Sequence, residues 1–212
     1  MLTLCATAQR IEHIGRDDVR VHTSAGVVNA RQMVVAAGAW SAALCAGLGV
    51  RLPIVAARGN SITLAPGVAA APRRPLLLVD QRLAVNPLSS GLRITGGFGL
   101  TSTADRATSA RRSQQLVRRA AEVLQVPASA EPTRPWTGLR PATPDGLPVI
   151  GRLPGAPSVI VAAGHGMLGS STGLGTGAAV AALLTGAPAL VDEAVVSPAR
   201  FARGRAKGTS TR

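Results

Sequence analysis

The chain has 212 residues and 46% of them are apolar, so it can bury a sizeable core and is too apolar to be disordered. It carries 23 basic and 10 acidic residues, for a net charge of +13, but no Tyr, two Phe and two Trp. So few aromatic side chains argue against base stacking on single strands, and no zinc-finger or recognition-helix signature is found, so no nucleic-acid partner is expected.

The first fifty residues are predicted to form short strands followed by a helix. Apolar and polar residues alternate in IEHIG, DDVRVHTSAG and VVNARQMVVAAG, which is typical of half-buried strands. Residues 32–37 indicate a buried strand that leads into a tight Ala-Ala-Gly loop. Residues 40–48 have helical character, and Pro53 closes that element.

The middle of the chain is again strand-like and then helical. IVAARGNSITL, PLLLVDQRLAVNPL and GLRITGGF predict members of an antiparallel sheet. Residues 105–124 predict an amphipathic helix, with Leu116, Ala120, Val123 and Leu124 on the apolar face and the Arg pairs on the solvated face. Residues 127–135 are a proline-rich connection.

The last part of the chain has a different texture. WTGLRPATPDGLPVIG is predicted to be a loop whose prolines restrict the backbone on either side of Arg140. SVIVAAG predicts a buried strand, GHGMLGSS a glycine-rich turn, and TGLGTGAAVAALLTG a helix of small residues that ends at Gly186. The residues after Arg200 predict a disordered basic tail.

The strand, turn and helix at residues 158–186 are the first candidate site. Glycines at 164, 166 and 169 would let backbone amides approach a ligand, and the start of the helix would attract an anion or an electron-rich ring. The alternative is a glycine turn needed only for close helix packing. Close helix–strand contact is also the expected reason for the later GLGTG run at 173–177, which lies inside the predicted helix.

Arg140 is the second candidate, because a guanidinium held on a stiff segment suits recognition of a substrate carboxylate. The alternative is an ion pair, with Asp145 as the nearest acidic residue in the sequence. His165 lies in the glycine turn without a partnered nucleophile, so a hydrolase is not indicated.

The two cysteines, Cys5 and Cys45, have no metal-ligand spacing, so free thiols and no metal site are expected. The N-terminus lacks the apolar run of a signal peptide, and no stretch suits a membrane-spanning helix. A cytoplasmic chain is expected, with peripheral attachment to the inner membrane as an alternative.

Several segments resemble one enzyme family in order and spacing. VVAAGAWSAAL (34–44) and PWTGLRPATPDGLPVIG (135–151), followed by AAGHGMLGSSTGLGTG, resemble the D-amino-acid oxidase superfamily of FAD-dependent oxidoreductases. The PxxxxRGNSITL stretch (53–64) and SPARF (197–201) also fit. The similarity covers residues 5–201 and is greatest to bacterial D-amino-acid dehydrogenases, with glycine oxidases next.

The resemblance implies a mixed α+β fold, in which an antiparallel substrate-binding domain is inserted into a partial FAD-binding domain. Residues 1–50 and 136–200 would belong to the FAD domain, 51–135 to the substrate domain, and 201–212 to the tail. The family's N-terminal βαβ unit, with its GxGxxG turn and ribose-binding acid, has no counterpart in this sequence.

The resemblance also implies roles for single residues. Arg140 matches the residue that binds the substrate carboxylate, and Met167 also belongs to the substrate site. Glycine oxidases have an Arg where Met167 stands, which favours the dehydrogenases. Covalent-flavin relatives have a Cys where Gly138 stands, so FAD should be noncovalent here. The expected FAD-binding residues are Ala8, Gly38, Trp40, His165, Gly166, Met167, Leu168, Gly169, Ser170 and Ser171.

The implied activity is oxidative deamination of D-amino acids or related amines. A hydride passes from Cα to flavin N5, giving an imino and then a keto acid, with a quinone or oxygen as the final electron acceptor. Because the FAD-anchoring groups are missing, one alternative is a truncated, non-catalytic fragment or a subunit that needs a separate FAD-anchoring chain. A basic module that binds nucleic acid or a membrane surface is the alternative from another class.

Overall fold

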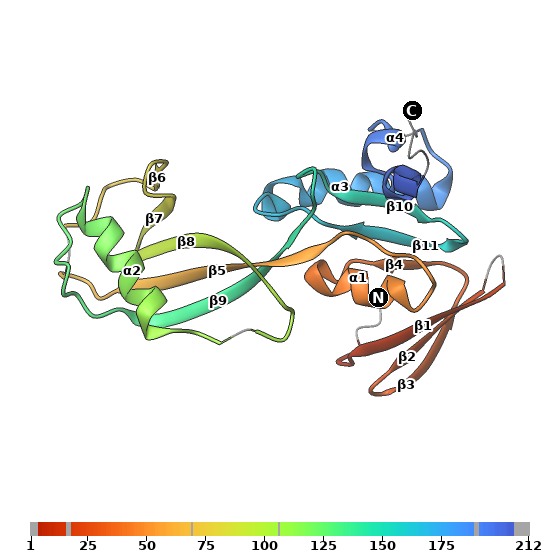
Figure 1. The fold of residues 1–212 in the computed structure, drawn as a ribbon, viewed down its shortest axis with the longest axis horizontal. Coiled ribbons are helices and arrows are strands. Elements are labelled where there is room, and N and C mark those ends of the chain that lie inside the picture. The colour runs from red at the N-terminus through yellow and green to blue at the C-terminus, as the bar shows by residue number, and fades with distance from the viewer. Residues whose placement is uncertain (1–3, 16–17, 69, 106, 189–190, 206–212) are drawn as a thin grey trace, which may run out of the picture. The chain divides into compact units, whose positions relative to one another are not determined.

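The computed structural model describes residues 4–15, 18–68, 70–105, 107–188 and 191–205 (Figure 1). The chain divides into two compact units, the first made of Met1–Val55 and Pro141–Arg212 and the second of Ala56–Arg140. These borders lie slightly later in the chain than the predicted ones. The fold is mixed α+β with mainly antiparallel sheets, as expected. The assignment of one unit to FAD and the other to substrate stays a prediction.

The first unit contains two three-stranded sheets. One is an antiparallel meander of β1 (Ala8–Gly15), β2 (Asp18–Thr23) and β3 (Gly26–Ala30). The other has the order β10-β11-β4, with the bounds Val149–Leu153, Ala156–Ala163 and Met33–Val35. In it β11 pairs antiparallel with β10 and parallel with β4. The continuous apolar run of β11 fits this central position, because a central strand is covered on both faces.

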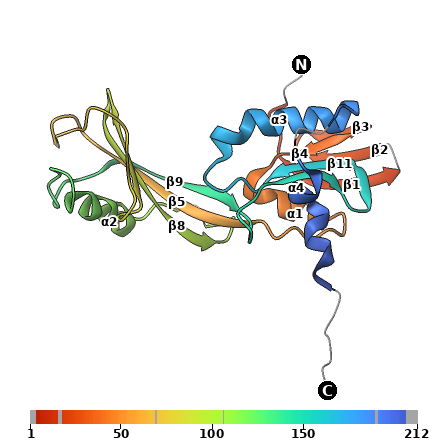
Figure 2. The same cartoon turned by 90° about the horizontal axis from the view of Figure 1, so that it is seen from above.

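The first unit is layered around the β10-β11-β4 sheet. One face packs with the β1-β2-β3 sheet and α1 (Ser41–Ala46), which follows the short 3-10 helix η1 (Gly38–Trp40). The other face packs against α3 (Gly169–Thr185) and α4 (Glu193–Val196) through residues such as Ile150. Figures 1 and 2 show α3 lying along β10 and β11. None of the described helices is both long and apolar enough to cross a membrane.

The segment predicted as a disordered tail is partly structured. Pro198–Arg205 forms a 3-10 helix, η2, so the prediction is wrong for residues 201–205, and residues 206–212 lie outside the described part. Phe201 packs against the core of the first unit, and Arg200 lies over its ring at 4.1 Å. The contact of Phe201 with distant core residues holds the start of this segment, whereas composition alone indicated a solvated tail.

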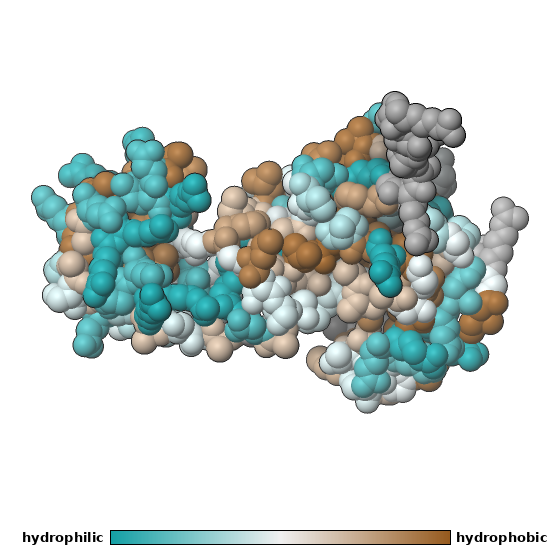
Figure 3. All heavy atoms as spheres, in the orientation of Figure 1, coloured by the Kyte–Doolittle hydropathy of each residue, from teal (hydrophilic) through white to brown (hydrophobic). Residues whose placement is uncertain are grey.

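The second unit is a five-stranded antiparallel sheet with one helix, α2 (Ala110–Ala121). The strand order is β6-β7-β8-β5-β9, with the bounds Leu76–Leu78, Leu83–Leu88, Gly91–Thr101, Val55–Leu64 and Thr133–Ala142. Leu116 and Val117 of α2 pack on Ile62 and Ile94. The arginines of α2 lie outward, and hydrophilic residues cover this side of the unit in Figure 3.

Arg140 lies on a strand and not, as predicted, in a loop. The prolines at 135 and 141 suggested a loop because proline cannot donate a backbone hydrogen bond. β9 is the edge strand of its sheet, however, and pairs only with β5. One side of an edge strand needs no partner, so proline is tolerated there. β9 also includes Thr133–Pro135, which were predicted to belong to the proline-rich connection at 127–135.

Candidate functional site

Two loops of the first unit leave the same end of a parallel strand pair. Val35 of β4 and Val161 of β11 are register partners, so Gly38–Trp40 and the turn beginning at Gly164 both follow carboxyl ends at one sheet edge. Ligands of open α/β sheets bind outside these carboxyl ends. The structure thus brings the predicted FAD-binding residues 38, 40 and 165–171 to one end of the sheet.

The turn after β11 owes its shape to two glycines. Gly164 and Gly166 have φ angles of 84° and 55°, which favour glycine. The Gly166 N–H donates to the carbonyl of Pro141 at 2.8 Å. A Cβ on Gly164 would lie 2.8 Å from Cγ2 of Thr143, whereas a Cβ on Gly166 would meet nothing within 4 Å. Close packing therefore explains Gly164, and Gly166 faces open space.

Helix α3 begins at this turn with an uncompensated positive end. Its N-cap, Leu168, provides no side-chain hydrogen bond, and the first turn contains no acidic residue. The first amides of a helix lack intrahelical partners and carry a partial positive charge. Backbone that a ligand can approach closely, followed by such a helix end, fits an electron-rich flavin ring.

His165 is held by the helix that follows it. Its Nε2 lies 2.8 Å from the Thr176 hydroxyl, and that hydroxyl donates to the carbonyl of Thr172 at 3.0 Å. Because one hydroxyl proton serves one acceptor, Nε2 carries the hydrogen and Nδ1 is left as an acceptor. Partial burial lowers the pKa of His165, which favours the neutral ring.

Several side chains near the turn are exposed. Met167 and Leu168 are 70% and 62% exposed, and Leu174 is 92% exposed. A Cβ on Gly173, Gly175 or Gly177 would meet nothing within 4 Å, so close helix–strand contact does not explain these glycines in the described part of the chain. That expectation is wrong.

Ala8 lies elsewhere in the first unit. It is the exposed first residue of β1, in the other three-stranded sheet, and not at the end of the β4–β11 pair. Its expected contact with FAD stays a prediction.

Arg140 lies at the border of the second unit, and the next residue, Pro141, belongs to the first. Its Nη1 donates to the carbonyl of Gly97 at 3.1 Å, and no acidic partner is found among the described residues. Partial burial lowers the pKa of Arg140, but a guanidinium stays protonated at neutral pH. Its other N–H groups can therefore receive a carboxylate.

A glycine that the sequence analysis did not single out shapes this arginine site. β5 has a bulge between Arg58 and Asn60, and a Cβ on the intervening Gly59 would overlap the guanidinium of Arg140. The Asn60 side chain accepts a hydrogen bond from Thr137 of β9 at 3.1 Å, which ties the two strands together. The sequence did contain a signal for this role. Gly59 lies inside a predicted strand, and glycine within a strand marks a bulge or a close approach of another group.

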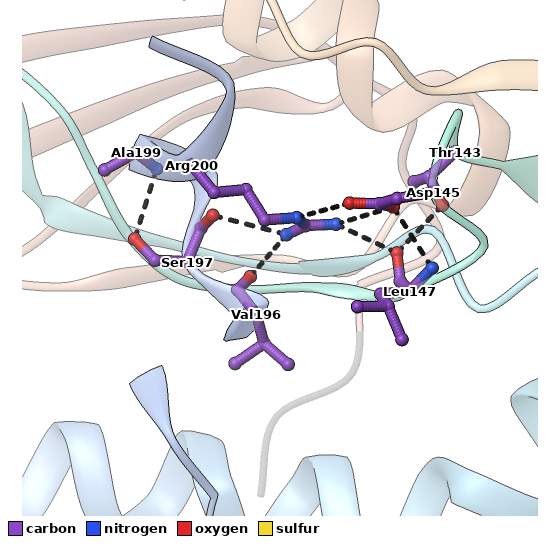
Figure 4. A network of polar contacts seen from close by, with 7 residues as sticks. All are labelled: Thr143, Asp145, Leu147, Val196, Ser197, Ala199 and Arg200. Carbon is purple, nitrogen blue, oxygen red and sulfur yellow. Dashed lines mark hydrogen bonds and ion pairs between the residues drawn. The ribbon is translucent and has the colours of Figure 1, made fainter. Parts of the chain in front are cut away.

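Asp145 forms its ion pair with Arg200 and not with Arg140. The predicted alternative, an ion pair between Arg140 and Asp145, is therefore wrong. Figure 4 shows the Arg200 guanidinium between the Asp145 loop and the C-terminal segment. Nε and Nη2 donate to the carboxylate at 2.8 and 3.2 Å, and Nη2 also donates to Leu147 at 3.0 Å. Nη1 donates to the carbonyls of Val196 and Ser197 at 2.8 and 3.2 Å. All five guanidinium donors are thereby used.

This ion pair supports the loop that contacts the glycine turn. The hydrogen bond from Arg200 lowers the pKa of Asp145 to about 2. Asp145 also accepts from the Leu147 amide at 3.1 Å, and Thr143 donates to the Leu147 carbonyl at 2.8 Å. Thr143 faces Gly164, and the Pro141 carbonyl accepts a hydrogen bond from Gly166. Because Asp145 and Arg200 hold this loop in place, the segments PDG (144–146) and SPARF (197–201) contribute to the shape of the turn.

Comparison with known proteins agrees with this architecture. The chain is 33% identical over 196 residues to a D-amino acid dehydrogenase of Bradyrhizobium diazoefficiens, covering 91% of this chain and 46% of the relative. It is 32% identical over 181 residues to a glycine oxidase of Pseudomonas aeruginosa, covering 85% and 49%. The chain spans about half the length of these curated relatives.

Solved structures show the same fold. Glycine oxidase from Geobacillus kaustophilus superimposes with a TM-score of 0.76 at 29% identity, covering 92% of this chain and 52% of that one. L-proline dehydrogenase from P. horikoshii gives a TM-score of 0.77 at 21% identity, covering 94% and 54%, and shows the fold alone. The family model for DAO, FAD dependent oxidoreductase, matches residues 4–183. The chain therefore belongs to the DAO family of FAD-dependent oxidoreductases.

Proposed function

We propose that this chain takes part in FAD-dependent oxidative deamination of D-amino acids. The observation that carries the proposal is the turn at residues 164–168, where open backbone and the uncompensated end of α3 follow a parallel strand pair. The names of the relatives, D-amino acid dehydrogenase and glycine oxidase, support an amino-acid substrate.

In this proposal bound FAD would supply a hydride acceptor for the substrate Cα–H, and the imino acid product would be hydrolysed to a keto acid. Residues 165–171, with Gly38 and Trp40, would hold the flavin, and the positive end of α3 would favour negative charge near its ring. Met167 provides an apolar contact for the substrate. Gly138 offers no nucleophile, which supports noncovalent binding of the cofactor.

Arg140 is proposed to bind the substrate carboxylate and so to orient the Cα–H bond. Its single bond to Gly97 leaves a forked set of donors that matches two carboxylate oxygens. Partial burial strengthens this contact, because the surrounding medium screens charge less than water does.

The proposal is tested with the purified 212-residue chain, FAD, a D-amino acid such as D-alanine and a dye as electron acceptor. We expect flavin absorbance to remain with the protein after gel filtration. R140A should raise KM by about 10-fold to 100-fold, as loss of charged hydrogen bonds implies. R119A, which removes an exposed charge from α2, should leave KM unchanged. An unchanged KM in R140A removes Arg140 from the substrate site.

A second candidate is a non-catalytic piece, or a subunit that uses FAD-anchoring groups from elsewhere. The chain's span, about half that of its relatives, supports it. A purified chain that retains no FAD and oxidises no D-amino acid would favour this candidate over the first.

A further inference from the structure

The second unit has a cavity of about 500 Å³ in its sheet. It is lined by Ser61 of β5, Arg93 and Thr95 of β8, and Arg134, Pro135 and Trp136 of β9. Side chains alternate between the two faces of a strand. Since Ile62 and Ile94 pack with α2, the neighbouring Ser61, Arg93 and Thr95 belong to the opposite face. The volume lies in the range of small-molecule sites.

The backbone of β9 has an unusual conformation at one residue that lines this cavity. Arg134 has a φ of 49°, a left-handed conformation that non-glycine residues rarely adopt. Arg134 and Trp136 are two residues apart, so the alternation of a strand places both side chains on one face, and both residues line the cavity. The residue with the unusual φ is therefore the one that brings a second guanidinium to the wall.

The two guanidinium groups of the cavity are unpaired donors. Neither Arg93 nor Arg134 has an ion pair or side-chain hydrogen bond within the described ranges, and the lining contains no carboxylate. Thr95 donates to the Ser61 hydroxyl at 3.1 Å, and Ser61 is only 8% exposed. Because Ser61 already accepts this bond, its own proton is available to a ligand. The cavity therefore offers two cations and a hydroxyl to an anion.

Trp136 gives the cavity an apolar wall. The side chain is 62% exposed, and a Cβ on Gly138 would overlap its ring, so the indole lies along β9. Aromatic rings pack favourably against one another in offset or edge-to-face arrangements. An anion without an apolar body would leave this wall exposed to water.

We propose that this cavity binds a small aryl carboxylate, with the carboxylate between Arg93 and Arg134 and the ring against Trp136. The site is assigned independently of the FAD and substrate roles, because all of its residues lie in the second unit and none is among the residues assigned to the flavin or the substrate carboxylate.

The experiment uses the full chain with W40F, so that Trp136 is the sole tryptophan and reports by fluorescence. Phenylacetate is titrated beside two matched probes, acetate without a ring and phenylacetamide without a charge. We expect saturable quenching by phenylacetate at concentrations where acetate and phenylacetamide have little effect. R93A and R134A should each weaken phenylacetate binding at least 10-fold.

R134G separates binding from folding. Glycine favours the positive φ at this position, so this variant should be at least as stable as the parent and still lose phenylacetate binding. R119A, on the α2 side of the sheet, removes the same charge and should bind normally. Equal losses in R119A and R93A, or equal responses to acetate and phenylacetate, would mean non-specific attraction to a basic chain and overturn the proposal.

R140A decides between this cavity and the proposed substrate site. We expect phenylacetate binding to survive R140A. Loss of binding in R140A with full binding in R93A and R134G would place the ligand at Arg140, which refutes the cavity site and leaves the proposed function intact. Binding that depends on Arg93 and Arg134 supports the cavity site whether or not the chain oxidises D-amino acids.

Discussion

At the scale of single residues, Gly164 and Gly166 are glycines for different reasons. Both have positive φ, but only Gly164 lies against a neighbour, the methyl group of Thr143. The sequence predicted the glycine turn and its place after a buried strand. It could not separate the packing role from the ligand role, because the partner, Thr143, lies on a loop that approaches only in the folded chain.

Alanine substitutions separate these two roles. G166A should lower the free energy of unfolding by about 1–2 kcal/mol, the cost of a left-handed conformation for a residue with a Cβ. G164A carries the same cost and adds the 2.8 Å approach to Thr143, so it should destabilise more. Urea unfolding of both variants measures the difference. Equal losses would show that the approach of Thr143 costs nothing.

At the scale of elements, the strand that holds Arg140 was the main error of sequence reasoning. Proline in a sequence pattern predicts the end of regular structure, but an edge strand tolerates proline. Whether a strand lies at an edge depends on the order of strands in the sheet, which the local sequence does not indicate. The buried strand predicted at 158–164 is β11, shifted by one or two residues, and the predicted glycine end of α3 is confirmed, because apolar runs and helix ends are local signals.

The bulge in β5 gives a prediction about Arg140. A Cβ introduced by G59A would displace the Arg140 guanidinium, which is the end of a flexible side chain, so the fold should lose little stability. If Arg140 binds the substrate carboxylate, KM for a D-amino acid should rise while the thermal midpoint stays nearly constant. Steady-state kinetics and thermal unfolding of the same sample check this. G99A, at a glycine of β8 with free space for a Cβ, is the matched control.

The ion pair between Arg200 and Asp145 should make stability depend on pH. The pKa of Asp145 is lowered in the folded chain, so the stabilisation is complete above the unfolded value, about pH 4, and is lost as pH falls through about 2. In D145N, the free energy of unfolding should fall less steeply between about pH 4 and pH 2 than in the parent chain, as urea unfolding at several pH values would measure.

R200A should cost about 1–2 kcal/mol near neutral pH, at the lower end for charged hydrogen bonds because the Asp145 side chain is 35% exposed. R152A is the control, since Arg152 donates only to the carbonyls of Pro157 and Leu183. It should lower stability without flattening the pH profile. A flattened profile in R152A would contradict the assignment to Asp145.

At the scale of the whole molecule, the second unit is continuous in sequence and the first is not. The hydrophobic cluster under α2, as far as the described residues show it, is built from residues between Ile62 and Ala130, so this unit has a core of its own. The core of the first unit combines residues from both ends of the chain, such as Val35 and Val161. Sequence patterns indicated both sets of strands, but the pairing of β4 with β11 spans the other unit and has no local signal.

This difference predicts how excised segments behave. Residues 56–140 expressed alone should unfold cooperatively in urea, with the circular dichroism of a mixed sheet and helix. Residues 1–55 alone should show no cooperative transition, because β4 would lack its partner β11. A segment 56–140 without a cooperative transition would show that its core is insufficient.

The parallel pairing of β4 with β11 also sets an order of events on the ribosome. About 125 residues separate the register partners Val35 and Val161, and at about 5–20 residues per second their synthesis takes roughly 6–25 s. During this time the nascent chain carries an apolar strand with no neighbour, while the inserted sheet can already fold beside it. Chaperones that hold nascent polypeptides should therefore engage residues 33–55 during this interval.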